Sequence, residues 1–311
     1  MKKVISVVIP CHNEARNIPL IVPEIVKNIP KKYAYEIVLV DDGSTDLTHQ
    51  EITKLCNKDR RVKGVIFNRN FGHQAAIMAG LKHTTGEAII SLDADFQHPP
   101  HLLPKFINQW EAGHDLVRSQ KIADGHLPPL KSFFKKIGYA IWNYVTDGAL
   151  LPGGSDFRLI SKPIKDYLSQ SKENQIFLRG NVTLASGNPT VIKYKVNKRK
   201  FGRSSYTTKM FANMFINGFI SFSNKPLRIA SLTGSLLFLT TTLFIIGDII
   251  RALLIGESII HGWITSMVVT IFLNAIIMIY LGILGEYIIV IFKETKKRPP
   301  YLITRDRKSV V

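Results

Sequence analysis

The stretch that decides the fold lies at residues 91–100 and reads Ser91-Leu92-Asp93-Ala94-Asp95-Phe96-Gln97-His98-Pro99-Pro100. It continues an apolar run over residues 88–92, which is typical of a buried strand, and Pro99-Pro100 ends regular structure. Residues i and i+2 of a strand face the same side, so we expect Asp93 and Asp95 to direct two carboxylates to one point. Mg²⁺ and Mn²⁺ prefer such oxygens, and Mg²⁺ is often held by one or two carboxylates together with substrate phosphates. The alternative is a polar turn.

Strand-like and helix-like segments alternate upstream of this stretch. The expected strands are 4–9, 36–40, 62–67 and 88–92, and the expected helices are 14–29, 47–57 and 73–83. This alternation predicts an α/β fold with a mainly parallel sheet covered by helices. Ligands bind beyond the carboxyl ends of such strands, where the polar segments 10–14, 41–46 and 93–95 lie. Their shared position favours a ligand and metal site over a polar turn, while the lack of G-x-G-x-x-G after a strand disfavours a dinucleotide dehydrogenase.

The composition narrows the classes of partner. The chain has 311 residues, a net charge of +18 and 46% hydrophobic residues, so it can form a folded core. The charge indicates a polyanionic partner, which is nucleic acid, an anionic membrane face or a phosphorylated substrate. The two cysteines, Cys11 and Cys56, have no metal-ligand spacing, which fits a reducing, cytosol-facing location.

Two long apolar segments lie near the C-terminus. Residues 229–247 carry no charge, and residues 258–285 contain no Asp, Glu, Lys or Arg. A helix over the first segment covers about 28 Å, close to the thickness of a hydrocarbon core. The tail is rich in Lys and Arg but the connection 255–261 has none, which predicts that both termini are cytoplasmic. The alternative is a buried helical hairpin in a soluble protein.

These segments divide the chain into three parts. Residues 1–225 are expected to form a cytosolic catalytic domain, residues 226–292 a two-helix transmembrane hairpin, and residues 293–311 a basic cytosolic tail. Amphipathic helices are predicted near 130–145 and 207–223, either facing the core or lying in the membrane interface. No nucleic-acid-binding signature occurs, so anionic lipid and phosphate substrates explain the basic excess better.

Several motifs occur together in the order of one known family. They read Val8-Ile9-Pro10-Cys11-His12-Asn13-Glu14, Val40-Asp41-Asp42-Gly43-Ser44-Thr45-Asp46, Arg69-Asn70-Phe71-Gly72, Asp93-Ala94-Asp95-Phe96-Gln97-His98-Pro99-Pro100, Gly154-Ser155-Asp156-Phe157-Arg158-Leu159 and Arg199-Lys200-Phe201-Gly202-Arg203-Ser204-Ser205-Tyr206. With the apolar segments they cover nearly the whole chain. The chain thus resembles the family-two glycosyltransferases with a Rossmann-like GT-A domain. More narrowly, it is similar to polyprenyl-phosphate glycosyltransferases such as dolichol-phosphate mannose synthase and the bacterial undecaprenyl-phosphate glucosyltransferases with two C-terminal transmembrane helices.

The resemblance implies a reaction. A sugar would pass with inversion from a nucleotide-diphosphate sugar, UDP-glucose or UDP-N-acetylhexosamine before others, to undecaprenyl phosphate. The product is a polyprenyl-phosphate sugar for cell-envelope glycosylation. The resemblance also implies Mg²⁺ or Mn²⁺ as cofactor and the bacterial cytoplasmic membrane as location. It leaves open whether the protein is a homo-oligomer.

Three alternatives stay open. The first is a GDP-mannose-dependent polyprenyl-phosphate mannose synthase. The second is a transferase that extends a polysaccharide or glycolipid, although residues 175–180 do not match the Gln-x-x-Arg-Trp motif of processive members. The third is a non-catalytic membrane sugar-binding scaffold, which the joint presence of four aspartates disfavours: Asp42, Asp93, Asp95 and Asp156.

The resemblance also implies roles for the donor-side residues. The nucleotide-sugar pocket is formed by Pro10, Asn13, Glu14, Asp41 and Asp42, with Asp93 helping to hold the donor. Asn13 is also a candidate N-cap of the helix expected after it. The metal ligand is Asp95, assisted by Asp93 and Gln97.

Asp156 corresponds to the catalytic carboxylate of the family. The acceptor is a phosphate monoester with a second pKa of about 6, so it is largely deprotonated at neutral pH. We therefore expect Asp156 to position the acceptor or the sugar and to stabilise positive charge, rather than to act as a base. The alternative for Asp156 is a turn residue after Gly153-Gly154.

The acceptor phosphate is expected to bind just before the membrane segment. Donors there are Arg199, Ser204, Ser205, Tyr206 and Lys209. Many relatives carry Lys at the position of Ser205, so Arg203 or Lys209 is the substitute, and a solvated basic loop is the alternative. Arg158 and Arg179 are further phosphate candidates or members of structural ion pairs. No histidine is assigned to catalysis, and His98 is expected to belong to the turn.

Overall fold

A computed structural model describes residues 2–122, 154–170, 178–196, 225–255, 263–296 and 299–307. The chain divides into two compact units. The first comprises Met1–Met210 and Lys297–Val311, and the second comprises Phe211–Lys296. The amphipathic segments predicted near 130–145 and 207–223 lie outside the described residues.

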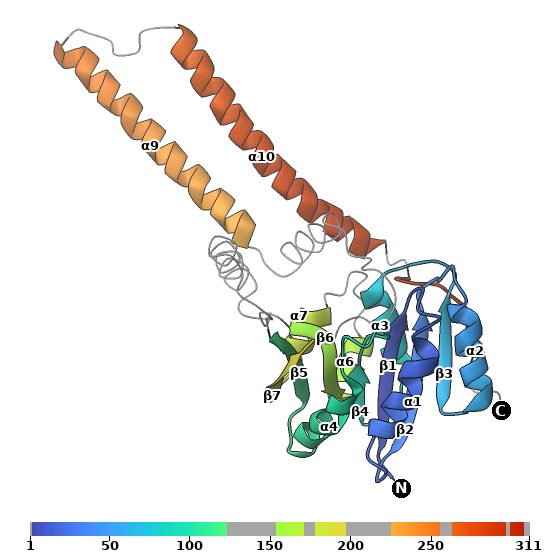
Figure 1. The fold of residues 1–311 in the computed structure, drawn as a ribbon. Coiled ribbons are helices and arrows are strands. Elements are labelled where there is room, and N and C mark those ends of the chain that lie inside the picture. The colour runs from blue at the N-terminus through green and yellow to red at the C-terminus, as the bar shows by residue number, and fades with distance from the viewer. Residues whose placement is uncertain are drawn as a thin grey trace. The chain divides into compact units, whose positions relative to one another are not determined.

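The first unit is built on an eight-stranded sheet with the order β7-β5-β6-β4-β1-β2-β3-β8 (Figure 1). Its strands are β1 (Val4–Cys11), β2 (Ala34–Asp41), β3 (Val62–Phe67), β4 (Ala88–Ser91), β5 (Leu116–Ile122), β6 (Gly154–Ser161), β7 (Pro189–Lys195) and β8 (Ile303–Arg307). The pairs β1–β2, β1–β4, β2–β3 and β5–β7 are parallel. The pairs β4–β6, β5–β6 and β3–β8 are antiparallel. The predicted α/β fold with a mainly parallel sheet is confirmed.

Helices cover both faces of this sheet. They are α1 (Ile18–Asn28), α2 (Thr48–Lys58), α3 (His73–Lys82), η1 (Pro100–Leu102), α4 (Leu103–Glu111), α6 (Lys162–Gln170) and α7 (Leu178–Leu184). The apolar residues of α1, α2 and α4 belong to one core cluster, and those of α3, α6 and α7 belong to a second. The strands between them are therefore buried on both faces, which explains their nearly continuous apolar sequence.

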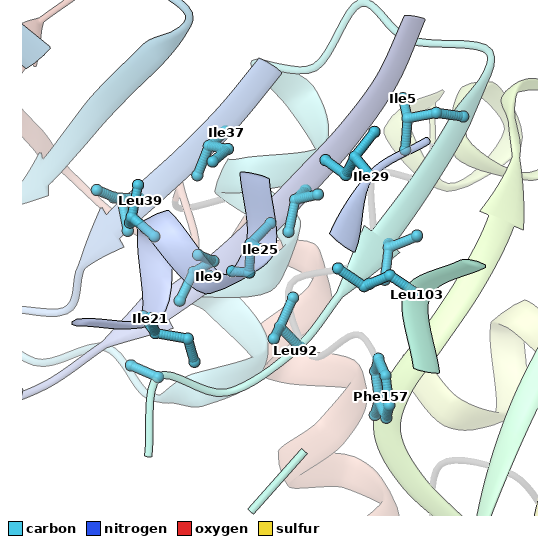
Figure 2. Close-up of a cluster of buried hydrophobic side chains, with 14 of the residues drawn as sticks. Ile5, Ile9, Ile21, Ile25, Ile29, Ile37, Leu39, Leu92, Leu103 and Phe157 are labelled. Atoms are coloured by element: carbon cyan, nitrogen blue, oxygen red, sulfur yellow. The ribbon is translucent and has the colours of Figure 1, made fainter. Parts of the chain in front are cut away.

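Strand β1 illustrates how the two cores are divided. Ile5, Val7 and Ile9 pack in the first cluster, whereas Val8 packs in the second, and all four side chains are fully buried. Figure 2 shows Ile5 and Ile9 beside the α1 side chains in the first cluster. This alternation follows from the two-residue period of a strand.

The first helix starts later than predicted. It begins at Ile18 rather than at residue 14, with Pro19 in its first turn, where a proline is favoured because its missing N–H has no partner to lose. Asn13 does not cap it. Instead, Asn13 has a φ of 58° and its Oδ1 accepts the Thr45 N–H at 2.9 Å. Residues 12–17, between β1 and α1, therefore form a loop at the edge of the sheet.

The segment expected to be a basic tail contains strand β8. This strand pairs antiparallel with β3, and the Asn68 N–H donates to the Leu302 carbonyl at 3.2 Å. The Tyr301 ring stacks on Phe67 with centroids 5.0 Å apart. Because β8 covers the outer edge of β3, residues near the C-terminus belong to the same folded unit as the N-terminal strands.

The second unit contains two long helices, α9 (Lys225–Ile255) and α10 (Trp263–Thr295). Within the described residues, only α10 holds a stretch long and apolar enough to cross a membrane, over Val269–Phe292, and α9 holds a shorter apolar stretch over Leu227–Leu243. One of the two predicted spans therefore passes this test. The stretch in α10 ends beyond the expected residue 285 and includes Glu286.

A buried carboxylate joins three segments of the first unit. Glu36 in β2 accepts the Ser6 hydroxyl at 2.5 Å, the Lys63 ammonium at 2.6 Å and the Thr85 N–H at 2.5 Å. Burial alone raises the pKa of Glu36, but these hydrogen bonds outweigh it and lower the pKa below the ordinary value of 4.5. A group whose pKa is lower in the folded state stabilises that state above its unfolded pKa, and this contribution is lost as the pH falls through the folded pKa.

We expect Glu36→Gln to lower the free energy of unfolding by about 2 kcal/mol at pH 7.5, because Lys63 then loses a charged partner. In a unit of this size that corresponds to a fall of about 5 °C in the unfolding midpoint. The difference from the wild type should begin to narrow as the pH falls below 4.5, where Glu36 of the unfolded chain becomes protonated, and should be lost once the pH passes the lower pKa of the folded state. Thermal unfolding of the full chain in detergent, followed at pH 7.5 and below pH 4.5, measures the difference in unfolding midpoint between the variant and the wild type.

Glu87→Gln is the matched control. Glu87 lies 3.8 Å from the Lys3 ammonium, and its side chain is 50% exposed. This exposed ion pair should contribute little to the free energy of unfolding at either pH. An equal loss of stability in the two variants would contradict the role given to the buried network.

Candidate active site

The candidate site lies at the carboxyl ends of four neighbouring parallel strands. Strands β4, β1, β2 and β3 are adjacent in the sheet, and Cys11 at the end of β1 is paired with Asp41 at the end of β2. The loops that follow these strands therefore meet at one edge. Pro10 is buried in β1 one residue before this edge, opposite Val40 of β2.

Asp41 and Asp42 organise the loops that follow β2 and β3. Both are buried, and the Asp41 Oδ1 accepts the Ser44 N–H at 2.9 Å. The Asp42 carboxylate accepts the Phe71 N–H at 2.7 Å and the Gly72 N–H at 3.0 Å. Burial raises the pKa of Asp42 and outweighs the opposing effect of these two N–H groups. Asp42 therefore ties the end of β2 to the start of α3.

Gly43 allows these loops to approach each other. Its φ is +63°, and a Cβ at this position would lie 2.2 Å from the Arg69 carbonyl carbon and 2.5 Å from the Asn70 nitrogen. Any other residue would have to push the backbone of 69–70 away and would adopt an unfavourable conformation.

Asn13 and Glu14 join the loop after β1 to the loop after β2. The Asn13 N–H donates to the Ser44 Oγ at 2.9 Å, and the Glu14 N–H donates to the Thr48 Oγ1 at 2.8 Å. The structure thus brings Pro10, Asn13, Glu14, Asp41 and Asp42 to the same edge of the sheet.

Asp93, Asp95 and Gln97 follow β4. Asp95 is buried, and its Oδ1 accepts the Gln97 N–H at 3.0 Å. Phe96 between them has a φ of 65°, which is uncommon for a bulky residue and turns the chain back at this point. The two carboxylates and the Gln97 amide therefore come from one tight turn.

His98 supports this turn as a neutral side chain. Its Nδ1 accepts the Asp93 N–H at 3.0 Å, and its ring stacks on Phe157 with centroids 5.2 Å apart. Because Nδ1 is an acceptor, its 3.5 Å approach to the Asp93 Oδ2 is not an ion pair. Burial lowers the pKa of His98, which agrees with the neutral form. The prediction that His98 belongs to the turn is confirmed.

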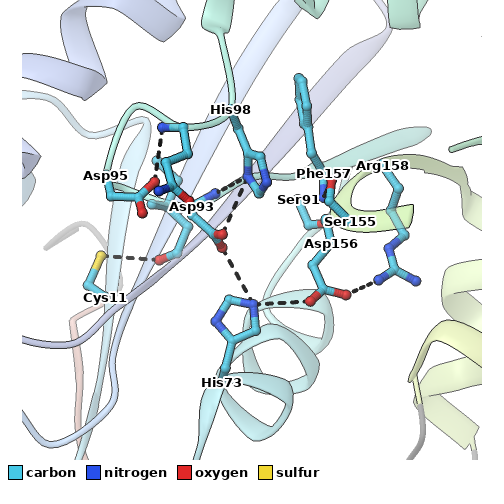
Figure 3. Close-up of polar contacts among 12 residues, drawn as sticks. Cys11, His73, Ser91, Asp93, Asp95, His98, Ser155, Asp156, Phe157 and Arg158 are labelled. Atoms are coloured by element: carbon cyan, nitrogen blue, oxygen red, sulfur yellow. Dashed lines mark hydrogen bonds and ion pairs between the residues drawn. The ribbon is translucent and has the colours of Figure 1, made fainter. Parts of the chain in front are cut away.

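Asp156 lies in strand β6, not in a turn. It is buried, and the Arg179 guanidinium contacts it at 2.8 Å (Nη2 to Oδ2) and 3.1 Å (Nε to Oδ1). The Arg158 guanidinium also contacts its Oδ1 (Figure 3). Burial raises the pKa of Asp156, but the two guanidinium groups outweigh burial and hold the pKa well below its usual range. Arg158 and Arg179, left open above, thus form ion pairs with Asp156.

The structure adds His73, which the sequence analysis did not assign to the site. This first residue of α3 has its Nε2 3.4 Å from the Asp93 Oδ1 and 3.5 Å from the Asp156 Oδ2 (Figure 3). Burial lowers the pKa of His73, but the two carboxylates outweigh it and raise the pKa to about 9. The available signal was its position: His73 follows the Arg69-Asn70-Phe71-Gly72 motif at the carboxyl end of β3.

The donor atoms suit a divalent ion that is shared with a substrate. In the part of the chain that the structure describes, no three His, Cys, Asp or Glu side chains form a complete metal site. The Asp93 Oδ1 is buried and, among the described residues, is approached by the His73 Nε2 at 3.4 Å without an ideal hydrogen bond. One or two carboxylates completed by substrate phosphates are the usual environment of Mg²⁺, so Asp93, Asp95 and Gln97 fit this kind of ion.

The predicted lipid-phosphate residues fall outside this description. Arg199, Ser204, Ser205, Tyr206 and Lys209 all lie outside the described residues. The described part of the candidate site consists of the loops after β1 to β4, the start of α3, and Asp156 in β6.

Comparison with known proteins identifies the family. A model described as Glycosyl transferase family 2 matches residues 6–150. The chain is 37% identical over 300 residues to the putative glycosyltransferase CsbB of Bacillus subtilis (strain 168), which covers 96% of this chain and 91% of that protein. It is 35% identical over 305 residues to the bactoprenol glucosyl transferase of Shigella phage SfX, which covers 96% of this chain and 98% of that protein.

A solved structure shows the same fold. The crystal structure of glucosyl-3-phosphoglycerate synthase from Mycobacterium tuberculosis, in complex with Mn²⁺, uridine-diphosphate and glucosyl-3-phosphoglycerate, has a TM-score of 0.50. The sequence identity is 17%, and the match covers 71% of this chain and 80% of that chain. The geometry and the relatives together show that the chain is a glycosyltransferase with a GT-A fold and belongs to glycosyl transferase family 2.

Proposed function

We propose that this protein transfers a sugar from a nucleotide-diphosphate sugar to undecaprenyl phosphate at the bacterial cytoplasmic membrane. The observation that carries the proposal is the buried Asp156 carboxylate, kept charged by Arg158 and Arg179 beside the Asp93-Ala94-Asp95 turn. The full-length similarity to proteins named bactoprenol glucosyl transferase supports the lipid acceptor. UDP-glucose is the first candidate donor, followed by UDP-N-acetylhexosamine and then GDP-mannose.

The low pKa of Asp156 argues against general-base catalysis. A base works best when its pKa is near the working pH, and the pKa of Asp156 lies well below its usual range. The acceptor phosphate needs little help, because its second pKa of about 6 leaves it deprotonated at neutral pH. Asp156 instead stabilises the positive charge that develops at the anomeric carbon, and direct attack by the phosphate oxygen inverts that centre.

The donor side supplies binding and leaving-group stabilisation. Pro10, Asn13, Glu14, Asp41 and Asp42 shape the nucleotide pocket, and Asp93 holds the sugar diphosphate. A divalent ion, Mg²⁺ or Mn²⁺, bound by Asp95 with Asp93 and Gln97 neutralises charge on the departing diphosphate. On the acceptor side, the proposed phosphate ligands are Arg199, Ser204, Ser205, Tyr206 and Lys209.

The pairing of β8 supports a two-helix membrane hairpin. Because β8 belongs to the sheet that contains β1 to β7, the segment after α10 lies on the same side of a membrane as the catalytic domain. A chain that leaves this side and returns to it crosses the membrane an even number of times. With α10 as one crossing, α9 is the other, and both termini are cytoplasmic, in agreement with the basic residues after α10.

The transfer reaction is tested with isolated membranes, a panel of radiolabelled nucleotide sugars and undecaprenyl phosphate. We expect label in the lipid fraction that requires Mg²⁺ or Mn²⁺. We expect Asp95→Asn to lower the rate of transfer about 100-fold or more, because the ion loses the carboxylate of its main ligand. Asp166→Asn on α6 is the control, because the Asp166 side chain is 44% exposed and its carboxylate lies 3.4 Å from the ammonium of the neighbouring Lys165. Failure of every nucleotide sugar to label the lipid fraction would refute the proposed function.

The role of Asp156 is tested by pH dependence. We expect Asp156→Asn to lower kcat about 100-fold or more by a constant factor between pH 6 and 9, because Asp156 is ionised throughout this range. A base would behave differently. If Asp156→Asn reached near-normal turnover at high pH and failed only at low pH, general-base catalysis would be the better account.

The membrane topology is tested by cysteine labelling in intact cells. We expect Ser258→Cys, between the two helices, to react with a membrane-impermeant maleimide, and Ser309→Cys near the C-terminus to react only after permeabilisation. The wild-type chain is the control, because Cys11 and Cys56 are buried. Labelling of Ser309→Cys in intact cells would contradict an even number of crossings.

A further inference from the structure

Three carboxylates of the site belong to three different segments. Asp42 follows β2, Asp93 follows β4, and Asp156 lies in β6. The start of α3 contacts all three. The N–H groups of Phe71 and Gly72 bind Asp42, and the next residue, His73, faces the other two carboxylates through its Nε2 (Figure 3).

The strand register explains why Asp93 and Asp156 need a group between them. Strands β4 and β6 are antiparallel, with Ala88 opposite Ser161 and Ser91 opposite Arg158. Asp93 lies two residues after Ser91 and Asp156 lies two residues before Arg158, so both carboxylates are at the same end of this strand pair. Carboxylates brought together at one end of a strand pair repel each other when both are charged.

The other neighbours of these carboxylates do not join them. Arg158 and Arg179 contact Asp156, whereas the buried Asp93 Oδ1 has no hydrogen-bond partner among the described residues other than the approaching His73 side chain. The nearby His98 Nδ1 accepts the Asp93 N–H and so has no proton to donate to this carboxylate. The His73 Nε2 is 3.4 Å from the Asp93 Oδ1 and 3.5 Å from the Asp156 Oδ2.

We propose that His73 is a positioning residue for glycosyl transfer, whose Nε2–H holds the donor-binding carboxylate of Asp93 and the catalytic carboxylate of Asp156 in one fixed geometry. The inference rests on the proposed function, since it assigns these carboxylates to the two sides of the transfer. Without the Nε2–H, the carboxylates repel and turn apart, and the sugar is misplaced relative to Asp156. Misplacement of reacting groups by about 1 Å can lower a rate 100-fold.

Two variants separate the hydrogen-bond donor from the bulk of the side chain. His73→Gln keeps an N–H near the position of Nε2, whereas His73→Met has similar length and no donor. We expect His73→Met to lower kcat about 30- to 100-fold, with the KM for the nucleotide sugar within about threefold, because Asp42 is held by the Phe71 and Gly72 backbone. We expect His73→Gln to stay within about fivefold of the wild-type kcat.

A matched control and a double variant complete the test. His83→Met lies at the other end of α3, where His83 contacts the Ala79 carbonyl, and it should leave kcat unchanged. Because His73 acts through Asp156, the kcat of the double variant His73→Met/Asp156→Asn should lie within about threefold of the kcat of Asp156→Asn alone. The proposal would be overturned if His73→Met and His73→Gln lowered kcat equally, or if His73→Met left kcat unchanged. It would also be overturned if the losses of kcat in the two single variants multiplied in the double variant.

The activity of the wild-type enzyme distinguishes a failure of this inference from a failure of the proposed function. If the wild type labels no lipid with any nucleotide sugar, the proposed function fails. Metal-dependent hydrolysis of the nucleotide sugar by the same variants then decides the role of His73, because water replaces the lipid and the donor geometry is unchanged. The same ranking, with His73→Gln near the wild type and His73→Met about 30-fold slower, supports positioning, and equal hydrolysis in all variants overturns it.

Discussion

The Asp156 carboxylate is fully charged inside the protein because the guanidinium groups of Arg158 and Arg179 face it. Removing a charge from water is costly unless a partner of opposite sign and good hydrogen-bond geometry is present. The rest of the site is arranged around this charge. Strand β6 brings Asp156 beside the turn after β4, α7 brings Arg179, and α3 brings His73. A fixed negative charge results, and its surroundings make it a poor proton acceptor.

Backbone contacts hold together the loops that follow β1, β2 and β3. Asp42 binds two N–H groups at the start of α3, Asn13 binds the loop after β2, and Gly43 lets two loops approach within a distance that a Cβ forbids. Most of these side chains bind neighbouring loops rather than pointing into open space. Their carboxylates and amides therefore fix the backbone of these loops, and substitutions among them should change several loops at once.

The sequence predicted the parts of the site that follow from local rules. Alternating strands and helices gave the sheet, and the rule that ligands bind beyond parallel strand ends placed Asp41, Asp42, Asp93 and Asp95 together. Two features could not be predicted in this way. The contact of His73 with Asp93 and Asp156 depends on the β4–β6 register, which no local pattern encodes. Strand β8 has a charged sequence that is typical of a solvated tail, and only its pairing with β3 makes it a strand.

The pairing of β8 with β3 also sets an order of events during synthesis. Strand β3 is made early, but its outer edge stays uncovered until residues Ile303–Arg307 leave the ribosome, after both long helices. An uncovered strand edge is a site of mispairing and aggregation. The sheet is therefore completed only in a chain whose helices α9 and α10 have already been made, so the enzyme reaches its final fold at the very end of synthesis.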